Sequence, residues 1–88
     1  MKPSLSIYDF LKTLPDSSFF FPSKNSNCTF LGIADGETVA ILVVEKHKKL
    51  KKNHIEFSSR VIQAGGIYLV IRSLDDICEI AKVKGWHD

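Results

Sequence analysis

The sequence predicts a small α/β domain in which helices cover both faces of a mixed sheet. The chain has 88 residues, enough for a single hydrophobic core. The unbroken apolar run Val39 to Val44 is typical of a central strand buried on both faces. A second such run, Ile67 to Ile71, follows one helical segment, and a strand, helix and strand in this order place the two strands parallel. We therefore expect one domain over residues 1–88.

The elements before the central strand follow from local signals. A first helix is expected to begin with a capping box formed by Ser6 and Asp9 and to stop at Pro15. Its apolar stripe consists of Ile7, Phe10, Leu11 and Leu14. The aromatic run 19–21, bounded by Pro22, favours a short strand whose rings serve the core. The segments Cys28 to Ala34 and Thr38 to Glu45, joined by the turn dipeptide Asp35-Gly36, indicate a β-hairpin. The expected layout starts with a helix and a two- or three-stranded meander.

The second half of the chain predicts helix, strand and helix. The first of these helices ends at Gly65-Gly66, which suits a left-handed helix terminus. Its apolar side, expected to face inward, consists of Ile55, Phe57, Val61, Ile62 and Ala64. After the parallel strand, Ser73 caps a last helix with Asp76 at the capping-box position and Gly85 near its end. The buried stripe of this helix should contain Leu74, Ile77, Cys78 and Ala81. Trp86, beyond it, is expected to cover the edge of the core.

Composition narrows the class of protein. The chain is 44% hydrophobic and 25% charged, as in an ordinary folded domain. It has no apolar run of the roughly 18–20 residues that span a membrane, and Met1 to Ser6 does not resemble a signal peptide. The two cysteines, Cys28 and Cys78, are expected to be buried thiols, and no zinc-binding spacing occurs. We expect a cytoplasmic protein without a membrane partner.

A lysine run provides the most unusual charge pattern. Five of the twelve basic residues lie within seven positions, and they are Lys46, Lys48, Lys49, Lys51 and Lys52. This run is either a solvated loop or a phosphate-binding strip. Its place after a central strand favours the strip, because ligands of open α/β sheets gather beyond the carboxyl ends of the strands. His54 and Arg60, on the following helix, would extend it.

From Gly36 to Asp76 the chain resembles the virus-type replication-repair nuclease (VRR-NUC) domain, a minimal branch of the PD-(D/E)xK nuclease superfamily. The similarity lies in the stretch KLKKNHIEFSSRVIQAGGIYLVIRSLDDI, where a helix ends at Gly-Gly and an apolar strand closes with Arg-Ser and an acidic pair. The resemblance covers about half of the chain and implies a small restriction-endonuclease-like core. It also implies Mg²⁺- or Mn²⁺-dependent cleavage of nucleic acid, often in phages or other mobile elements.

The residues that such a nuclease needs are missing from the matching positions. Counting back from Gly65-Gly66, His54 replaces the helix glutamine of the family, Leu42 the glutamate of its Glu-x-Lys motif and Val44 the lysine. The aspartate of the family would fall near Asn27 or Cys28. Apolar side chains cannot hold the metal that polarises a phosphate. The resemblance therefore implies a nuclease fold without catalysis.

A shifted register leaves one catalytic alternative open. Glu45 and His47 lie on one side of an extended segment, and Asp35 or Asp16, which follows Pro15 as in the Pro-Asp motif of the superfamily, would complete a metal site.

Three functions follow from these observations. The first is nucleic-acid binding by a non-catalytic nuclease-like domain, a pseudoenzyme that needs no cofactor. The second is a protein-interaction or inhibitor module acting on a larger nucleic-acid machine. The third is an active Mg²⁺- or Mn²⁺-dependent endonuclease. A homodimer is compatible with the first, because two lysine strips at a fixed separation suit branched or two-stranded DNA.

Overall fold

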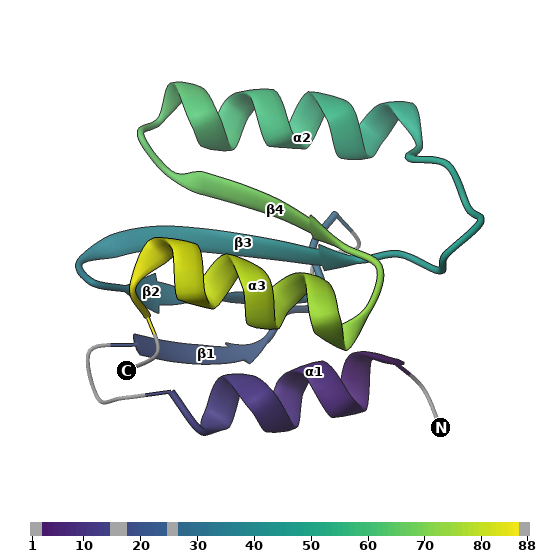
Figure 1. Ribbon diagram of the computed structural model, residues 1–88. Coiled ribbons are helices and arrows are strands. Elements are labelled where there is room, and N and C mark those ends of the chain that lie inside the picture. Colours follow the sequence, from purple (N-terminus) through teal and green to yellow (C-terminus); the bar gives the residue numbers. More distant parts are fainter. Residues whose placement is uncertain (1–2, 15–17, 25–26, 87–88) are drawn as a thin grey trace.

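The computed structural model describes residues 3–14, 18–24 and 27–86. Its elements confirm the expected order of helix, strands, helix, strand and helix (Figure 1). They are α1 (Pro3–Lys12), β1 (Ser18–Pro22), β2 (Phe30–Ala34), β3 (Glu37–Val43), α2 (Lys52–Gln63), β4 (Ile67–Ile71) and α3 (Leu74–Lys84). The strands form one sheet in the order β1-β2-β3-β4, with three antiparallel strands and then β4 parallel to β3.

The strand register assigns every strand residue to one of two faces, because directly opposed residues share a face and neighbours along a strand alternate. One face packs against α1 and α3 and contributes Phe20, Phe30, Val39, Ile41 and Ile71 to the core. We call the other the open face. Its strand residues are Phe19, Phe21, Leu31, Ile33, Thr38, Ala40, Leu42, Tyr68 and Val70.

The core lies between the sheet and the two terminal helices. Ile7 and Leu11 from α1 and Ile77 and Ala81 from α3 are buried against the sheet in one cluster. Trp86 is only 3% exposed, and its ring lies 5.8 Å from that of Phe20 in a tilted arrangement. The prediction that this tryptophan covers the edge of the core is confirmed. Burying an aromatic side chain of this size is a large contribution to stability in so short a chain.

The central strand is buried on both faces, as its sequence predicted, because Val39, Ala40, Ile41 and Leu42 are all at most 6% exposed. The two layers that flank it are nevertheless unequal. Figure 1 shows α2 alongside β4, on the side of the sheet away from β1, whereas α3 crosses in front of the strands. The sheet therefore has one fully covered face and one that is covered only in part.

Three burial predictions were wrong. Ile55 and Ile62 of α2 are 53% and 62% exposed, and no residue of that helix is buried. In the aromatic strand β1 only the middle ring enters the core, because alternation turns Phe19 and Phe21 to the open face. Leu74 is 41% exposed, since it lies at the first position of α3, above the core.

Turns and caps match the local signals closely. Asp35 and Gly36 have φ values of 52° and 81°, the left-handed pair that a tight hairpin turn requires. Gly65 and Gly85 are also left-handed, at 88° and 75°, and follow α2 and α3. Ser73 caps α3, its hydroxyl accepting a hydrogen bond from the Asp76 amide at 3.3 Å.

At the start of the chain, the predicted cap at Ser6 was wrong, because α1 begins at Pro3. A proline suits the first turn of a helix, where its missing N–H is not needed. Pro15, the expected stop, lies outside the described residues. Cys28 is buried and Cys78 half-buried, both as free thiols.

Candidate nucleic-acid interface

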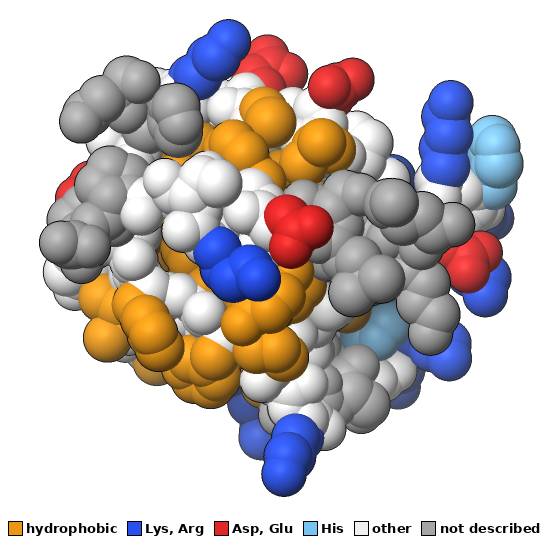
Figure 2. Space-filling model, turned by 90° about the horizontal axis from the view of Figure 1, so that it is seen from below, with side chains coloured by type: hydrophobic (Ala, Val, Ile, Leu, Met, Phe, Trp, Pro, Cys, Tyr) orange, Lys and Arg blue, Asp and Glu red, His pale blue; other side chains and the backbone are white. Residues whose placement is uncertain are grey.

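The lysine loop, residues 44–51, leaves the end of β3 and leads into α2 at one end of the sheet. In Figure 1 it is the long connection at the right, and Figure 2 shows Lys, Arg and His side chains gathered on that same side of the molecule. The side chains of the run, Lys46, Lys48, Lys49, Lys51 and Lys52, are all exposed. The ends of β3 and β4 lie here together because the two strands are parallel.

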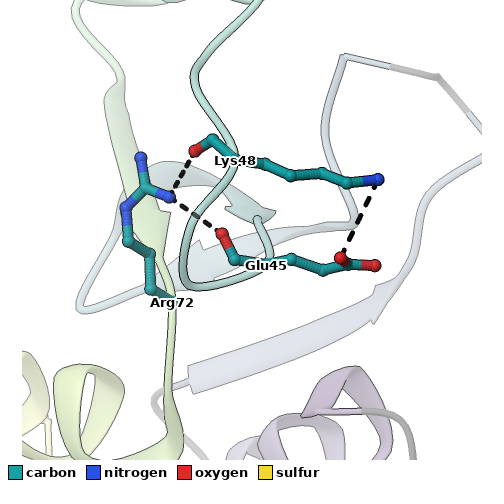
Figure 3. A network of polar contacts seen from close by, with 3 residues as sticks. All are labelled: Glu45, Lys48 and Arg72. Atoms are coloured by element: carbon teal, nitrogen blue, oxygen red, sulfur yellow. Dashed lines mark hydrogen bonds and ion pairs between the residues drawn. The ribbon is translucent and has the colours of Figure 1, made fainter.

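Arg72 holds this loop from the end of β4 (Figure 3). Its Nη1 donates to the backbone oxygens of Glu45 at 3.0 Å and Lys48 at 2.6 Å. The loop also contains its own turn, since the Lys48 amide donates to the Glu45 oxygen at 3.0 Å. A planar guanidinium can bind two carbonyl groups at once, which a lysine ammonium does less well. The loop is therefore fixed to the sheet, while its lysine side chains stay in solvent.

Two of the five lysines have carboxylate partners. Lys48 lies 3.8 Å from Glu45 and Lys52 lies 4.0 Å from Glu56, with all four side chains well exposed. Exposed pairs of this kind contribute little and exchange partners easily. Lys46, Lys49 and Lys51 form no ion pair with any carboxylate of the described residues. These three are the cations most readily available to an anionic ligand.

The two residues expected to extend the strip have different positions. His54 is half-buried, and its Nδ1 accepts a hydrogen bond from the Lys51 amide at 3.3 Å, so this imidazole closes the start of α2. Arg60 is exposed on α2, about 12 Å along the helix from Lys52. It lines a shallow hollow together with Asn27, Asn53, Glu56 and Phe57.

Sequence reasoning missed two basic residues at this end of the sheet. Arg72 directly follows β4. Because β4 is parallel to β3, this position places Arg72 at the same end of the sheet as the lysine loop that follows β3, which could have indicated the contact. Lys24 is exposed in the connection from β1 to β2. The side-chain oxygen of Asn27, which precedes β2, accepts a hydrogen bond from Asn53 of α2 at 2.6 Å, so Asn27 lies beside the start of α2.

The structure does not bring the three candidate catalytic residues together. Asp35 lies in the hairpin turn before β3, whereas Glu45 and His47 follow that strand. The seven residues of β3 separate them by about 20 Å, too far to share a metal ion. Among the described residues, no three His, Cys, Asp or Glu side chains are placed to hold a metal. Asp16, the other carboxylate considered, lies outside the described residues.

Packing occupies the positions where the resemblance places nuclease residues. Leu42 and Cys28 are 6% and 4% exposed. The Val44 amide donates to the Ile71 oxygen at 2.9 Å and prolongs the pairing of β3 with β4. The Asn27 oxygen accepts from the Tyr68 hydroxyl at 2.7 Å. Apolar contacts and backbone hydrogen bonds thus account for this part of the sheet.

The surroundings of Tyr68 change the acidity of its hydroxyl. Burial of its ring, and next the nearby Cys28 thiol, raise the pKa of Tyr68 to about 12. Its ring meets that of Phe57 edge-on at 5.9 Å, and this contact joins α2 to β4. A phenol that stays protonated to such high pH acts as a hydrogen-bond donor, which fits its bond to the Asn27 oxygen.

Comparison of the chain with protein-family models, with curated proteins and with solved structures finds no match. Within the described ranges, no helix combines the length and apolar character needed to cross a membrane.

Proposed function

We propose that the protein binds nucleic acid through the lysine loop and does not cut it. The observation that carries this proposal is a loop whose backbone is fixed by Arg72 while its four lysine side chains, and that of Lys52 at the start of α2, remain exposed. Ordering a cationic loop before binding lowers the conformational entropy lost when the ligand arrives. Phosphate groups spaced along a nucleic-acid backbone are the ligands that such a strip fits best.

Binding without cleavage is favoured by the same part of the sheet. Leu42 in β3 and Val44 just after it occupy the positions to which the resemblance assigns the glutamate and lysine of a metal-dependent nuclease, and Asp35 lies about 20 Å from Glu45. A degenerate nuclease-like domain from a phage or other mobile element fits both the resemblance and this chemistry. Metal-dependent cleavage remains the outcome that would replace the proposal.

The test is fluorescence anisotropy of end-labelled branched and duplex DNA, with Mg²⁺ or Mn²⁺ present, over a range of salt concentrations. Replacing Lys46, Lys49 and Lys51 with alanine should weaken binding. It should also reduce the slope of log affinity against log salt concentration by about three, one for each lost phosphate contact. The charge-matched control replaces Lys12, Lys82 and Lys84, which lie at the ends of α1 and α3.

Binding to the wild-type protein and to the control variant, but not to the loop variant, supports the proposal. Equal loss in both variants would show that only net charge matters. A fall in anisotropy over time, with a shortened labelled strand on a gel, would show cleavage, and Glu45→Ala would then tell whether the shifted register supplies it. No binding even at low salt would favour a protein partner instead.

A further inference from the structure

Over β1 and β2, no helix or strand of the described residues covers the open face. Phe19, Phe21 and Ile33 are 67%, 42% and 53% exposed. They form one continuous cluster, because Phe19 pairs across the strands with Ile33, and Phe21 with Leu31, while the two rings lie 6.0 Å apart. Figure 2 shows hydrophobic side chains massed at its lower left, away from the cationic side. Clustered exposure of this kind marks an interaction surface.

The helix that could cover this cluster lies elsewhere. Through Phe57, α2 packs against Tyr68 of β4, and Val61 lies beside Gly66. Both contacts are at the β4 edge of the sheet, whereas the apolar cluster belongs to β1 and β2. The strands β1 and β2 are antiparallel, and the solvated face of an antiparallel sheet ordinarily has polar side chains, whereas this one has Phe19, Phe21 and Ile33. No element of the described residues covers this apolar part of the face, which makes it a candidate contact surface for another molecule.

We propose that this cluster binds a second copy of the chain, face to face about a twofold axis. The charge pattern selects this partner: among the strand residues of the open face, none is charged. In a twofold pair the same surface meets itself, so a charge near the axis would meet the identical charge of the partner, and a neutral apolar surface avoids that cost. A nucleic-acid backbone, in contrast, would find no cation here.

The available area agrees with a dimer. A fully exposed Phe or Ile side chain of this kind presents about 150–200 Å², so Phe19, Phe21 and Ile33 together present roughly 300 Å². A stable interface of ordinary size buries about 800 Å² on each partner, with an apolar centre and a more polar rim. The cluster supplies that centre, and the half-buried Leu31 and the exposed Thr38 extend it on the same face.

The proposal is independent of what the lysine loop binds. The loop lies at the end of the strands and the cluster lies on their face, so pairing leaves the lysines in solvent. The dimer would hold two lysine loops at a fixed separation. Loss of dimerisation and loss of DNA binding can therefore be observed separately.

The experiment measures molar mass by light scattering after size exclusion, over a range of protein concentrations. The wild-type protein should approach twice the 9.9 kDa of one chain as concentration rises. Phe19→Glu and Ile33→Glu should each elute with the mass of one chain, because a twofold contact would bury two carboxylates face to face. The control is Val83→Glu, at a residue 81% exposed on α3, and it should dimerise like the wild type.

Circular dichroism of each variant shows whether it is folded. Should the glutamate variants not fold, amide chemical shifts of the wild-type protein on dilution replace them, and the changes should be confined to β1 and β2. A wild-type protein that stays a monomer up to about 1 mM, beyond which association is too weak to be specific, would overturn the proposal. So would a dimer that is unaffected by Phe19→Glu, or dilution shifts confined to α3.

Discussion

Replacing Arg72 with alanine should release the lysine loop from the end of β4. The guanidinium donates two hydrogen bonds, at 3.0 Å to the Glu45 oxygen and at 2.6 Å to the Lys48 oxygen. A hydrogen bond from a charged donor contributes about 1.5–3 kcal/mol when it is well shielded, and roughly half of that at an exposed site such as this one. We therefore expect Arg72→Ala, which removes both bonds, to lower the free energy of unfolding by about 1.5–3 kcal/mol. In a domain of this size, that corresponds to a decrease in Tm of about 6–24 °C.

Urea denaturation followed by circular dichroism measures this change. Hydrogen exchange adds a local measurement, because the Lys48 amide donates to the Glu45 oxygen at 3.0 Å and should lose protection when the loop is released. The matched control is Arg60→Ala, which removes an exposed arginine from α2 and should change stability by less than about 0.5 kcal/mol. Arg72→Lys should recover only part of the loss, since an ammonium does not reproduce the planar fork. Equal stability of the alanine variant and the wild type, with unchanged exchange at Lys48, would refute the assigned role.

Three further changes follow from the packing and the protonation of single residues. Gly32→Ala should lower the free energy of unfolding by at least about 2–3 kcal/mol in urea denaturation, because the new Cβ would meet the backbone of β1. Gly36→Ala meets no neighbour and should lower it by only about 1 kcal/mol, the cost of a positive φ. Equal effects of the two substitutions would contradict this interpretation. Trp86→Ala should cost about 3–5 kcal/mol, seen as a lower midpoint in the same assay, and a smaller loss than about 1 kcal/mol would show that the ring does not close the core. Burial raises the pKa of Tyr68 to about 12, so the folded state keeps the proton longer than the unfolded state, whose tyrosines titrate near 10. The stability linked to this proton is complete below pH ~10 and is lost between pH ~10 and ~12, and after screening by solvent it amounts to about 1 kcal/mol. Urea denaturation at these pH values should show that Tyr68→Phe abolishes this pH-dependent loss, whereas the control Tyr8→Phe keeps it.

The order of the elements could be predicted because its signals are local. The dipeptide Asp35-Gly36, the glycine at position 65 and the cap at Ser73 each act within a few residues, and the structure confirms all three. The central strand was recognised by its unbroken apolar run, which only a doubly covered strand tolerates. The start of α1 could not be placed, since a proline and a serine three residues apart are both good beginnings of a helix.

The position of α2 could not be predicted from the sequence. An apolar stripe shows that a helix packs against other elements, but it does not show which strands of the sheet the helix contacts. Phe57 and Val61 reach the β4 edge, so Ile55 and Ile62, on a different side of the helix, stay in solvent. The same displacement leaves part of the open face uncovered.

The charges of the candidate site could be predicted from the sequence, but the hydrogen bonds that hold its backbone in place could not. Five lysines in seven positions are visible in the sequence, whereas the bonds from Arg72 join residues 24 and 27 positions apart. Residue types alone suggest that Asp35 and Glu45 share a metal site. Only the length of β3, which separates them, decides against it.

Because α2 contributes no buried residue, it should be the first part of the molecule to open. Segments with few buried contacts unfold locally at a free energy well below that of the whole domain. The lysine loop is bound on its other side, through Arg72, to a strand that pairs with the central strand of the sheet. When α2 opens transiently, the segment after the lysine loop would become extended while the loop itself stays bound to Arg72. The basic surface would then combine a fixed loop with a mobile segment that carries Lys52 and Arg60.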